Sequence, residues 1–358
     1  MKESIVPSLE EIGERGLIRL IRKTFPCRRP GVILGIGDDA AIVRPGRGSV
    51  ILTKDLLVED VDFRRDRHPA FFIGRKSLAV NLSDIAAMGG QSCFALLGLG
   101  LPGDLPLAWA TEFLAGFRAA GRRYGVELVG GDISLSREIV ISVTLMGRSG
   151  RFARRSGARP GDDIYVTGTL GDAALGFDLI DRGFRKSGRG APTKNQPWTR
   201  EGWRELVRRT GWGAPPARGP VRSFLDPQPR LDAAKRLVRS GLPTSMIDVS
   251  DGLSVDLMHL CQESGTGAIV DLKAIPLSRG MRILGGAKAF DYALNGGEDF
   301  ELLFTVRPTR RSEALIAALG RSFPLTRIGR MKRGRGIKAI RPDGTQETLS
   351  AGGYEHFR

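Results

Sequence analysis

The chain has 358 residues, three cysteines and a formal net charge of +16. That length is enough for two domains with cores of their own, and no apolar run approaches the roughly 20 residues needed to span a bilayer. The cysteines are far apart and lack metal-ligand spacing, which argues against a zinc site and favours buried thiols in a reducing compartment. Because the N-terminus also lacks an apolar signal core, we expect a cytoplasmic protein.

Positive charge is concentrated in two segments, residues 182–230 and 327–341. Such a balance can indicate nucleic-acid binding. Neither segment has a helix-turn-helix pattern, an RNA-binding aromatic signature or zinc-finger spacing, so a surface that attracts anionic nucleotides or keeps the protein soluble is favoured. A basic nucleic-acid-binding protein is the alternative from another functional class.

The first part of the chain predicts a helix followed by alternating strands and helices. Ser8 and Glu11 form a capping box for a helix that runs to about Lys23. A glycine-rich stretch, residues 35–41, precedes a short strand and is neither a Walker loop nor a dinucleotide fingerprint. Hydrophobic periodicity then predicts helices at 74–88 and 109–124, and strands at 50–52, 58–63, 94–101, 127–129 and 139–147.

Residues 154–162 have the proline and glycine content of a domain junction, and we place the boundary near residue 150. An N-terminal α/β domain then spans residues 1–150 and a C-terminal α/β domain spans residues 151–358. The second domain carries a basic insertion at about 185–222 with three tryptophans, and packing of their rings is favoured over contact with nucleic acid. Further strands and helices alternate to the end of the chain, which indicates the α/β or α+β class.

One stretch, Met246 to Leu253, organises the candidate site. An apolar run ends at Asp248, and Ser250 is predicted to cap the helix that follows. The carboxylates of Asp248 and Asp251 are thus expected beside backbone N–H groups at a strand-to-helix corner, which suits both Mg²⁺ and phosphate. The same pattern, an apolar run that ends in aspartate, recurs at Asp39, Asp55, Asp84 and Asp132.

These aspartates, with glycines nearby and Arg155, favour phosphoryl transfer. That reaction needs Mg²⁺ to screen a polyphosphate and cationic groups near the migrating charge. The sequence has no GxSxG, HRD or DFG motif, which excludes a protein kinase and leaves a serine nucleophile unsupported. Asp84 is flanked by apolar residues of its helix and is therefore expected to face inward, where it needs a cation or donors.

Seven blocks occur in one order along nearly the whole chain: GIGDDA (35–40), AVNLSDIAAMG (79–89), VGGD (129–132), RSGARPGD (155–162), IDVSDGL (247–253), NGGEDFEL (295–302) and GYEHF (353–357). They resemble the thiamine-monophosphate kinase family of the aminoimidazole-ribonucleotide-synthetase-like superfamily. The resemblance implies a two-domain fold with mixed sheets flanked by helices, and N-terminal domains that pair in a homodimer.

The resemblance also implies ATP-dependent phosphorylation of thiamine monophosphate to thiamine diphosphate, by direct in-line transfer assisted by several Mg²⁺ ions. Asp251 and Arg155 would act in catalysis. The implied contacts with ATP are Gly131, Asp132, Arg155 and Ser250. The implied substrate contacts are Asp62, Glu298 and Tyr354. The implied Mg²⁺ ligands are Asp39, Thr53, Asp55, Asp84, Asp132, Asp248 and Asp251.

Two positions depart from the pattern of the family. Lys54 stands where a second hydroxyl residue is usual, and Asp62 stands where the family has a histidine that touches substrate. These departures leave open an ATP-dependent synthetase of the same superfamily that acts on another acceptor, such as an amide, a carbamoyl group or selenide. For a phosphate acceptor no protein base is required, because the acceptor is already ionised.

Overall fold

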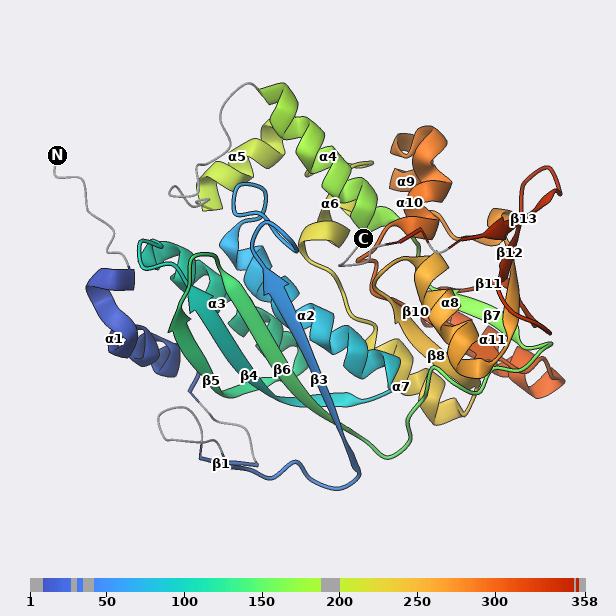
Figure 1. Cartoon of the computed structure of the whole chain (residues 1–358), viewed down its shortest axis with the longest axis horizontal. Coiled ribbons are helices and arrows are strands. Elements are labelled where there is room, and N and C mark those ends of the chain that lie inside the picture. The colour runs from blue at the N-terminus through green and yellow to red at the C-terminus, as the bar shows by residue number, and fades with distance from the viewer. Residues whose placement is uncertain (1–8, 27–30, 35–41, 188–199, 351, 354–358) are drawn as a thin grey trace. The chain divides into compact units, whose positions relative to one another are not determined.

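The computed structural model describes residues 9–26, 31–34, 42–187, 200–350 and 352–353. The chain forms two compact units, each with its own sheet (Figure 1). Unit 1 comprises residues 1–82, 92–150 and 180–210, and unit 2 comprises residues 83–91, 151–179 and 211–358.

Unit 1 is built on a four-stranded sheet in the order β3-β6-β4-β5. Its strands are β3 (Ser49–Val58), β4 (Gln91–Leu101), β5 (Glu127–Leu135) and β6 (Val140–Ser149). Strands β3 and β6 are antiparallel, whereas β4 and β5 are parallel. The accompanying elements are α1 (Leu9–Thr24), the two short paired strands β1 (Val32–Leu34) and β2 (Ile42–Val43), α2 (Ala70–Ala87), α3 (Leu107–Tyr124) and α5 (Arg200–Thr210).

The two faces of this sheet differ in burial. In β6 the alternate residues Ile141, Val143 and Leu145 are fully buried, and helices α2 and α3 lie behind the sheet (Figure 1). Successive side chains of a strand point to opposite faces. The other face is therefore the one that carries the exposed apolar side chains of Leu52 and Leu56 from β3.

Unit 2 is built on a seven-stranded sheet in the order β13-β12-β9-β11-β7-β10-β8. The only parallel pair between its described strands is β9 with β12. The strands are β7 (Asp163–Thr167), β8 (Pro243–Val249), β9 (Gly267–Asp271), β10 (Glu301–Val306), β11 (Leu325–Lys332), β12 (Ile337–Ile340) and β13 (Gln346–Leu349). The helices are α4 (Asp172–Ser187), α6 (Arg218–Leu225), α7 (Leu231–Ser240), α8 (Leu253–Ser264), α9 (Arg279–Leu284), α10 (Ala289–Asn295) and α11 (Arg310–Gly320), with two 3-10 turns, Leu272–Ala274 and Gly286–Lys288. Residues 180–187 of α4 belong to unit 1.

Alternate residues of the central strands pack into different cores in unit 2. Ile247 and Val249 of β8 pack with Leu257 and other residues of α8. Met246 of β8 packs instead with residues of α7, such as Leu237. The sheet is thus the middle of three layers, and a side chain at position 248 faces the same layer as Met246.

Several sequence expectations need correction at the level of elements. The strands predicted at 50–52 and 58–63 are one strand, β3, followed by a turn, and β5 continues past residue 129 to Leu135. The packing of tryptophans is confirmed for Trp203 and Trp212, which are buried, whereas Trp198 and the capping residue Ser8 lie outside the described residues. No helix in the described ranges is both long and apolar enough to cross a membrane.

Candidate active site

Asp248 lies at the end of β8 in unit 2, with only 2% of its surface exposed. The Ser83 side chain, near the end of α2, donates a hydrogen bond from Oγ to Asp248 Oδ2 over 2.6 Å. Ala86, one turn further along α2, belongs to the same apolar core as Met246. The packing of the end of α2 against this layer of unit 2 therefore brings Ser83 to the buried carboxylate.

The pKa of Asp248 is raised to about 6, chiefly by burial and then by the nearby charge of Asp84. The hydrogen bond from Ser83 and the charge of Arg155 act in the opposite direction. Two carboxylates that repel each other, with an arginine close by, are a donor set of hard oxygen atoms to which a divalent cation is suited. The charges of Asp84 and Arg155 therefore both act on the buried carboxylate of Asp248, and the binding roles of these three residues stay predictions.

The turn after β8 is held by Asp256, a residue that the sequence did not indicate. Asp256 is 1% exposed, and its Oδ2 atom accepts hydrogen bonds from the backbone N–H groups of Ser250, Asp251 and Gly252 over 3.1, 3.1 and 3.2 Å. The predicted capping role of Ser250 is wrong, because α8 begins at Leu253 after Gly252 and no side chain makes a capping bond. A carboxylate one turn inside the helix occupies these donors instead.

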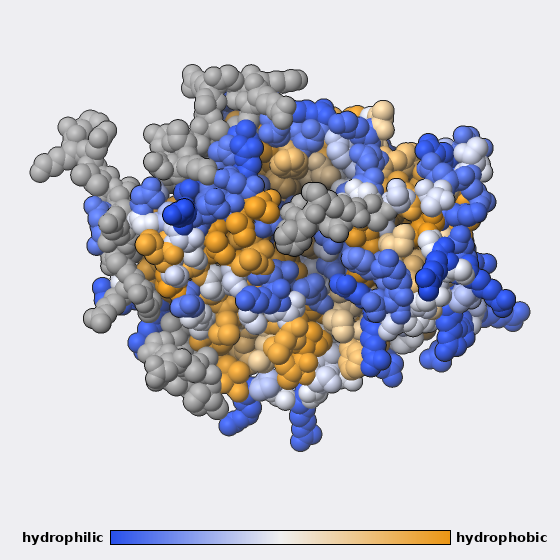
Figure 2. Space-filling view, in the orientation of Figure 1, coloured by the Kyte–Doolittle hydropathy of each residue, from blue (hydrophilic) through white to orange (hydrophobic). Residues whose placement is uncertain are grey.

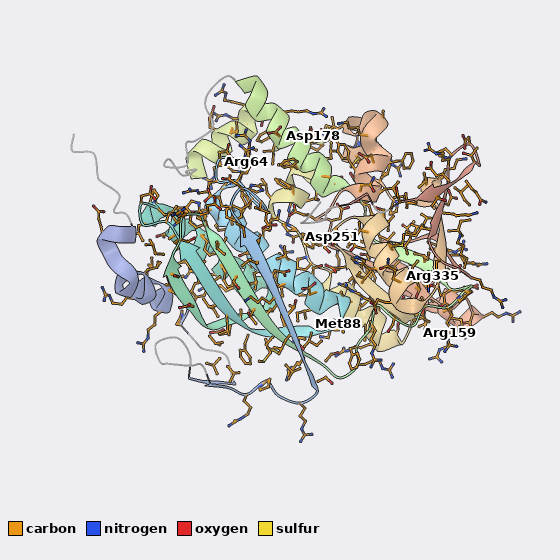
Figure 3. The ribbon with its side chains drawn as sticks, in the orientation of Figure 1. Arg64, Met88, Arg159, Asp178, Asp251 and Arg335 are labelled. Carbon is orange, nitrogen blue, oxygen red and sulfur yellow. The ribbon has the colours of Figure 1, made fainter. Side chains whose placement is uncertain are left out.

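The hydrogen bonds to Asp256 limit the ability of the turn to bind an anion. The N–H groups of residues 250–252 are already occupied by Asp256, so they do not form a free cradle for a phosphate. Burial, with the charges of Asp248 and Asp251, raises the pKa of Asp256 to about 8. The charge of Asp251, a residue labelled in Figure 3, thus contributes to the raised pKa of Asp256.

The loop between α10 and β10 is attached to the same turn. Glu298 N–H donates to Ser250 O, and Phe300 N–H donates to Val249 O, each over 2.8 Å. Glu298 and Phe300 have φ angles of 70° and 50°, and this left-handed conformation costs a non-glycine residue on the order of 1 to 2 kcal/mol. The predicted substrate residue Glu298 is therefore held in a strained segment beside Ser250.

Asp299, between these two residues, binds the beginning of α4. Its Oδ2 accepts from Gly171 N–H over 2.5 Å, and its Oδ1 accepts from Ala173 N–H over 3.2 Å. Burial raises the pKa of Asp299 well above its ordinary value, while the two N–H groups lower it. The partial positive charge at a helix N-terminus favours a carboxylate at this place.

Four predicted site residues of unit 1, Thr53, Asp55, Gly131 and Asp132, lie within strands and not at strand ends. Thr53 and Asp55 of β3 are paired with Leu145 and Val143 of β6, and they share the face of the buried Val143. Lys54 lies on the opposite face. The expectation that the strand ends at Thr53 is therefore wrong, although the two predicted ligands do share a face.

Gly131 and Asp132 lie in the middle of β5, beside Leu97 and Gly98 of β4. A Cβ atom at Gly131 would stand 1.9 Å from Leu97 O, so the close approach of the strands itself requires glycine there. Asp132 is exposed and, in the alternation of this sheet, shares the face of Gly98.

Asp62 has a partner in its own turn. Its Oδ2 atom accepts a hydrogen bond from Val58 N–H over 2.8 Å, and its own N–H donates to Val58 O over 2.9 Å. The residue at the family's histidine position therefore stabilises the turn after β3. Two other predicted residues, Asp39 and Tyr354, lie outside the described residues.

No group of three or more His, Cys, Asp or Glu side chains among the described residues is gathered so that it could hold a metal ion. Mg²⁺ is commonly held in proteins by one or two carboxylates, with water and substrate phosphates as its other ligands. The pair of Asp84 and Asp248 matches that mode of binding.

Comparisons with known proteins identify the class to which this fold and site belong. Residues 37–149 match the N-terminal domain of AIR synthase related proteins, and residues 159–341 match their C-terminal domain. The chain is therefore a two-domain member of this class, and the predicted α/β fold with mixed sheets flanked by helices is confirmed.

Relatives over nearly the full length narrow the class to one family. The chain is 35% identical to a thiamine-monophosphate kinase of Aquifex aeolicus over 94% of this chain and 98% of that protein. It is 36% identical to one of Escherichia coli K12 over 96% and 98%. A solved structure, AaThiL complexed with AMPPCP and TMP, is similar with a TM-score of 0.72, 33% identity and coverage of 99% and 100%. The chain belongs to the thiamine-monophosphate kinase family.

Proposed function

We propose that the protein catalyses ATP-dependent phosphorylation of thiamine monophosphate, giving thiamine diphosphate and ADP. The observation that carries this assignment is similarity along nearly the whole chain to thiamine-monophosphate kinases. One similar solved structure contains both AMPPCP, an analogue of ATP, and TMP. The two substrates are therefore ATP and thiamine monophosphate.

Mg²⁺ is the proposed cofactor, and the pair of Asp84 and Asp248 supports this proposal. The other proposed ligands are Asp39, Thr53, Asp55, Asp132 and Asp251. Burial, and after it repulsion from Asp84, raises the pKa of Asp248. The repulsion supports the proposal, because a divalent cation would relieve it. When bound, Mg²⁺ screens the charge of the polyphosphate so that a second anion can approach.

The residues of the chain supply position and charge. Arg155, whose charge reaches Asp248, would stabilise the negative charge of the migrating phosphoryl group. Asp256 holds the backbone of Ser250 and Asp251, so it orients the side chains of both. Contact of Ser250 with ATP is assigned to its side chain, since its N–H group donates to Asp256 and its carbonyl oxygen accepts from Glu298 N–H. The other proposed contacts with ATP are Gly131 and Asp132.

The residues proposed to contact thiamine monophosphate are Glu298, Tyr354 and Asp62. The attachment of Glu298 to Ser250 through its backbone supports its place beside the proposed ATP-binding turn. Asp62 is the less supported member, because its carboxylate already serves the turn at Val58. A carboxylate also suits the cationic thiazolium ring of thiamine better than it suits the phosphate of the acceptor.

A homodimer is the proposed assembly, paired through the uncovered face of the sheet in unit 1. Figure 2 shows apolar surface, in orange, over the strands β3, β6 and β4. Its apolar members are Val50, Leu52, Leu56 and Leu96, which are between 44% and 66% exposed. Several exposed apolar side chains on one sheet face are typical of a protein–protein contact. We further propose a cytoplasmic location and a division of the chain into domains at 1–150 and 151–358.

The test is a coupled assay with purified protein, ATP, Mg²⁺ and thiamine monophosphate, in which thiamine diphosphate is read by its fluorescence after oxidation. Product that depends on Mg²⁺ supports the proposal. An ATPase that responds instead to an amide, a carbamoyl compound or selenide would indicate another acceptor. The variant Asp251→Asn should fold and lose turnover; retained activity would contradict the role given to Asp251.

A further inference from the structure

Asp299 joins three parts of unit 2 that are far apart in the sequence. Its carboxylate accepts N–H groups of Gly171 and Ala173 at the start of α4. The residues on either side of it, Glu298 and Phe300, donate their N–H groups to Ser250 O, just after β8, and to Val249 O, at the end of β8. The loop 298–300 is therefore tied on one side to a helix N-terminus and on the other to the proposed ATP-binding turn.

The conformation of this loop is one that the chain would not adopt without such ties. Glu298 and Phe300 are both left-handed, a conformation that persists in non-glycine residues only where the surroundings enforce it. Close packing also restricts the neighbouring glycine, since a Cβ atom at Gly297 would lie 2.7 Å from Ser250 O. Strained backbone conformations that the surroundings enforce are common at ligand sites, where they fix the direction of a side chain.

We propose that Asp299 is a positioning residue, which holds Glu298 in its left-handed conformation and so directs Glu298 toward the acceptor substrate. This inference rests on the proposed function, because it assigns the acceptor to Glu298. The backbone angle at residue 298 sets the direction in which the side chain leaves the loop. The bonds from Asp299 to α4 keep that angle from relaxing.

The test compares Asp299→Asn with Asp172→Asn. Asparagine at 299 keeps one oxygen but turns an NH₂ group toward a backbone N–H group, so one of the two ties is lost. Asp172 is a matched control: it is a buried carboxylate at the same helix end. Its partners are the hydroxyl groups of Thr169 and Ser278, and neither belongs to the loop.

For Asp299→Asn we expect the KM for thiamine monophosphate to rise about tenfold or more, while the KM for ATP changes less than twofold. Asp172→Asn should change neither. Glu298→Ala should raise the KM for thiamine monophosphate in the wild-type background and add little in the Asp299→Asn background, because Glu298 is already misdirected there. Asp299→Glu, which keeps the carboxyl group on a longer arm, replaces Asp299→Asn if that variant does not fold.

An unchanged KM for thiamine monophosphate in the Asp299 variant would overturn the inference, as would equal losses for both substrates or additive effects with Glu298→Ala. Titration calorimetry of the wild-type protein with thiamine monophosphate distinguishes failure of the proposed function from failure of the inference about Asp299. If the wild type neither binds nor phosphorylates this acceptor, the proposed function fails together with the inference. If it does both and Asp299→Asn is normal, only the inference fails.

Discussion

Ser83 Oγ and Asp248 Oδ2 lie 2.6 Å apart although the two residues are 165 positions apart in the chain. The hydrogen bond stabilises the ionised form of a buried carboxylate that burial and Asp84 push toward protonation. Ser83 therefore helps to keep Asp248 available as an oxygen ligand near neutral pH.

Replacement of Ser83 by alanine should weaken binding of Mg²⁺. Loss of a hydrogen bond to a charged group is worth about 1.5 to 3 kcal/mol, which corresponds to roughly a tenfold or larger rise in the Mg²⁺ concentration for half-maximal activity. The control is Ser77→Ala on the same helix, since that buried hydroxyl donates only to Gly74 O. Equal Mg²⁺ dependence of the two variants would contradict the role of Ser83.

The raised pKa of Asp248 predicts a pH dependence of the metal-free protein. With a folded pKa of about 6 against about 3.9 in the unfolded chain, the folded state binds more protons between these values. Its stability should therefore fall as pH rises from about 4 to about 6, by on the order of 2 to 3 kcal/mol from this group. In the Asp248→Asn variant, the loss of stability between pH 4 and pH 6 should be smaller by this amount.

Thermal unfolding in the presence of a chelator measures this effect. Near pH 7 the Asp248→Asn protein should be more stable than the wild type in the chelator, yet inactive with Mg²⁺ present. Parallel curves of melting temperature against pH for the two proteins would show that Asp248 does not titrate in this window.

Asp256 predicts a contrast between two substitutions. At pH 7 a carboxyl group with a pKa of about 8 is mostly protonated, and asparagine matches its shape and its acceptor oxygen. Asp256→Asn should therefore keep most of the stability and activity. Asp256→Ala leaves three N–H groups without their acceptor, and each buried, unsatisfied donor costs roughly 1 to 3 kcal/mol. Denaturant unfolding and kcat measure the difference; similar losses in both variants would refute this account of the turn.

The exposed apolar face in unit 1 predicts a change in assembly. Leu52→Lys places a charge on that face, where Leu52 is 66% exposed, and should convert a dimer to a monomer because burying an unpaired charge is costly. Ile283→Lys is the control, since Ile283 of α9 in unit 2 is 55% exposed. Light scattering after size-exclusion chromatography reads the mass, and a dimer that persists in Leu52→Lys would exclude this face.

The fold class could be predicted from the sequence, because long motif blocks are visible in it. The sequence also singled out Asp84, Asp248 and Arg155, whose charges interact in the structure, while their roles in binding stay predictions. The prediction that Ser250 caps the helix was wrong. A serine before a helix and a carboxylate inside the helix compete for the same backbone N–H groups, and here the carboxylate of Asp256 accepts them. Asp256 and Asp299 were missed because each acts through backbone donors, and no spacing rule shows which donors a distant carboxylate meets. The strand ends predicted near Thr53 and Asp132 were also wrong. Both strands continue through these polar residues, which the hydrophobic pattern took as ends.

The central claim is tested most directly with ATP labelled in its γ-phosphate. The protein is incubated with labelled ATP, Mg²⁺ and thiamine monophosphate, and the thiamine compounds are separated. We predict label in the terminal phosphate of thiamine diphosphate, in amounts equal to the ADP formed, and none when Mg²⁺ is removed. Hydrolysis of ATP to labelled inorganic phosphate, without labelled thiamine diphosphate, would contradict the claim.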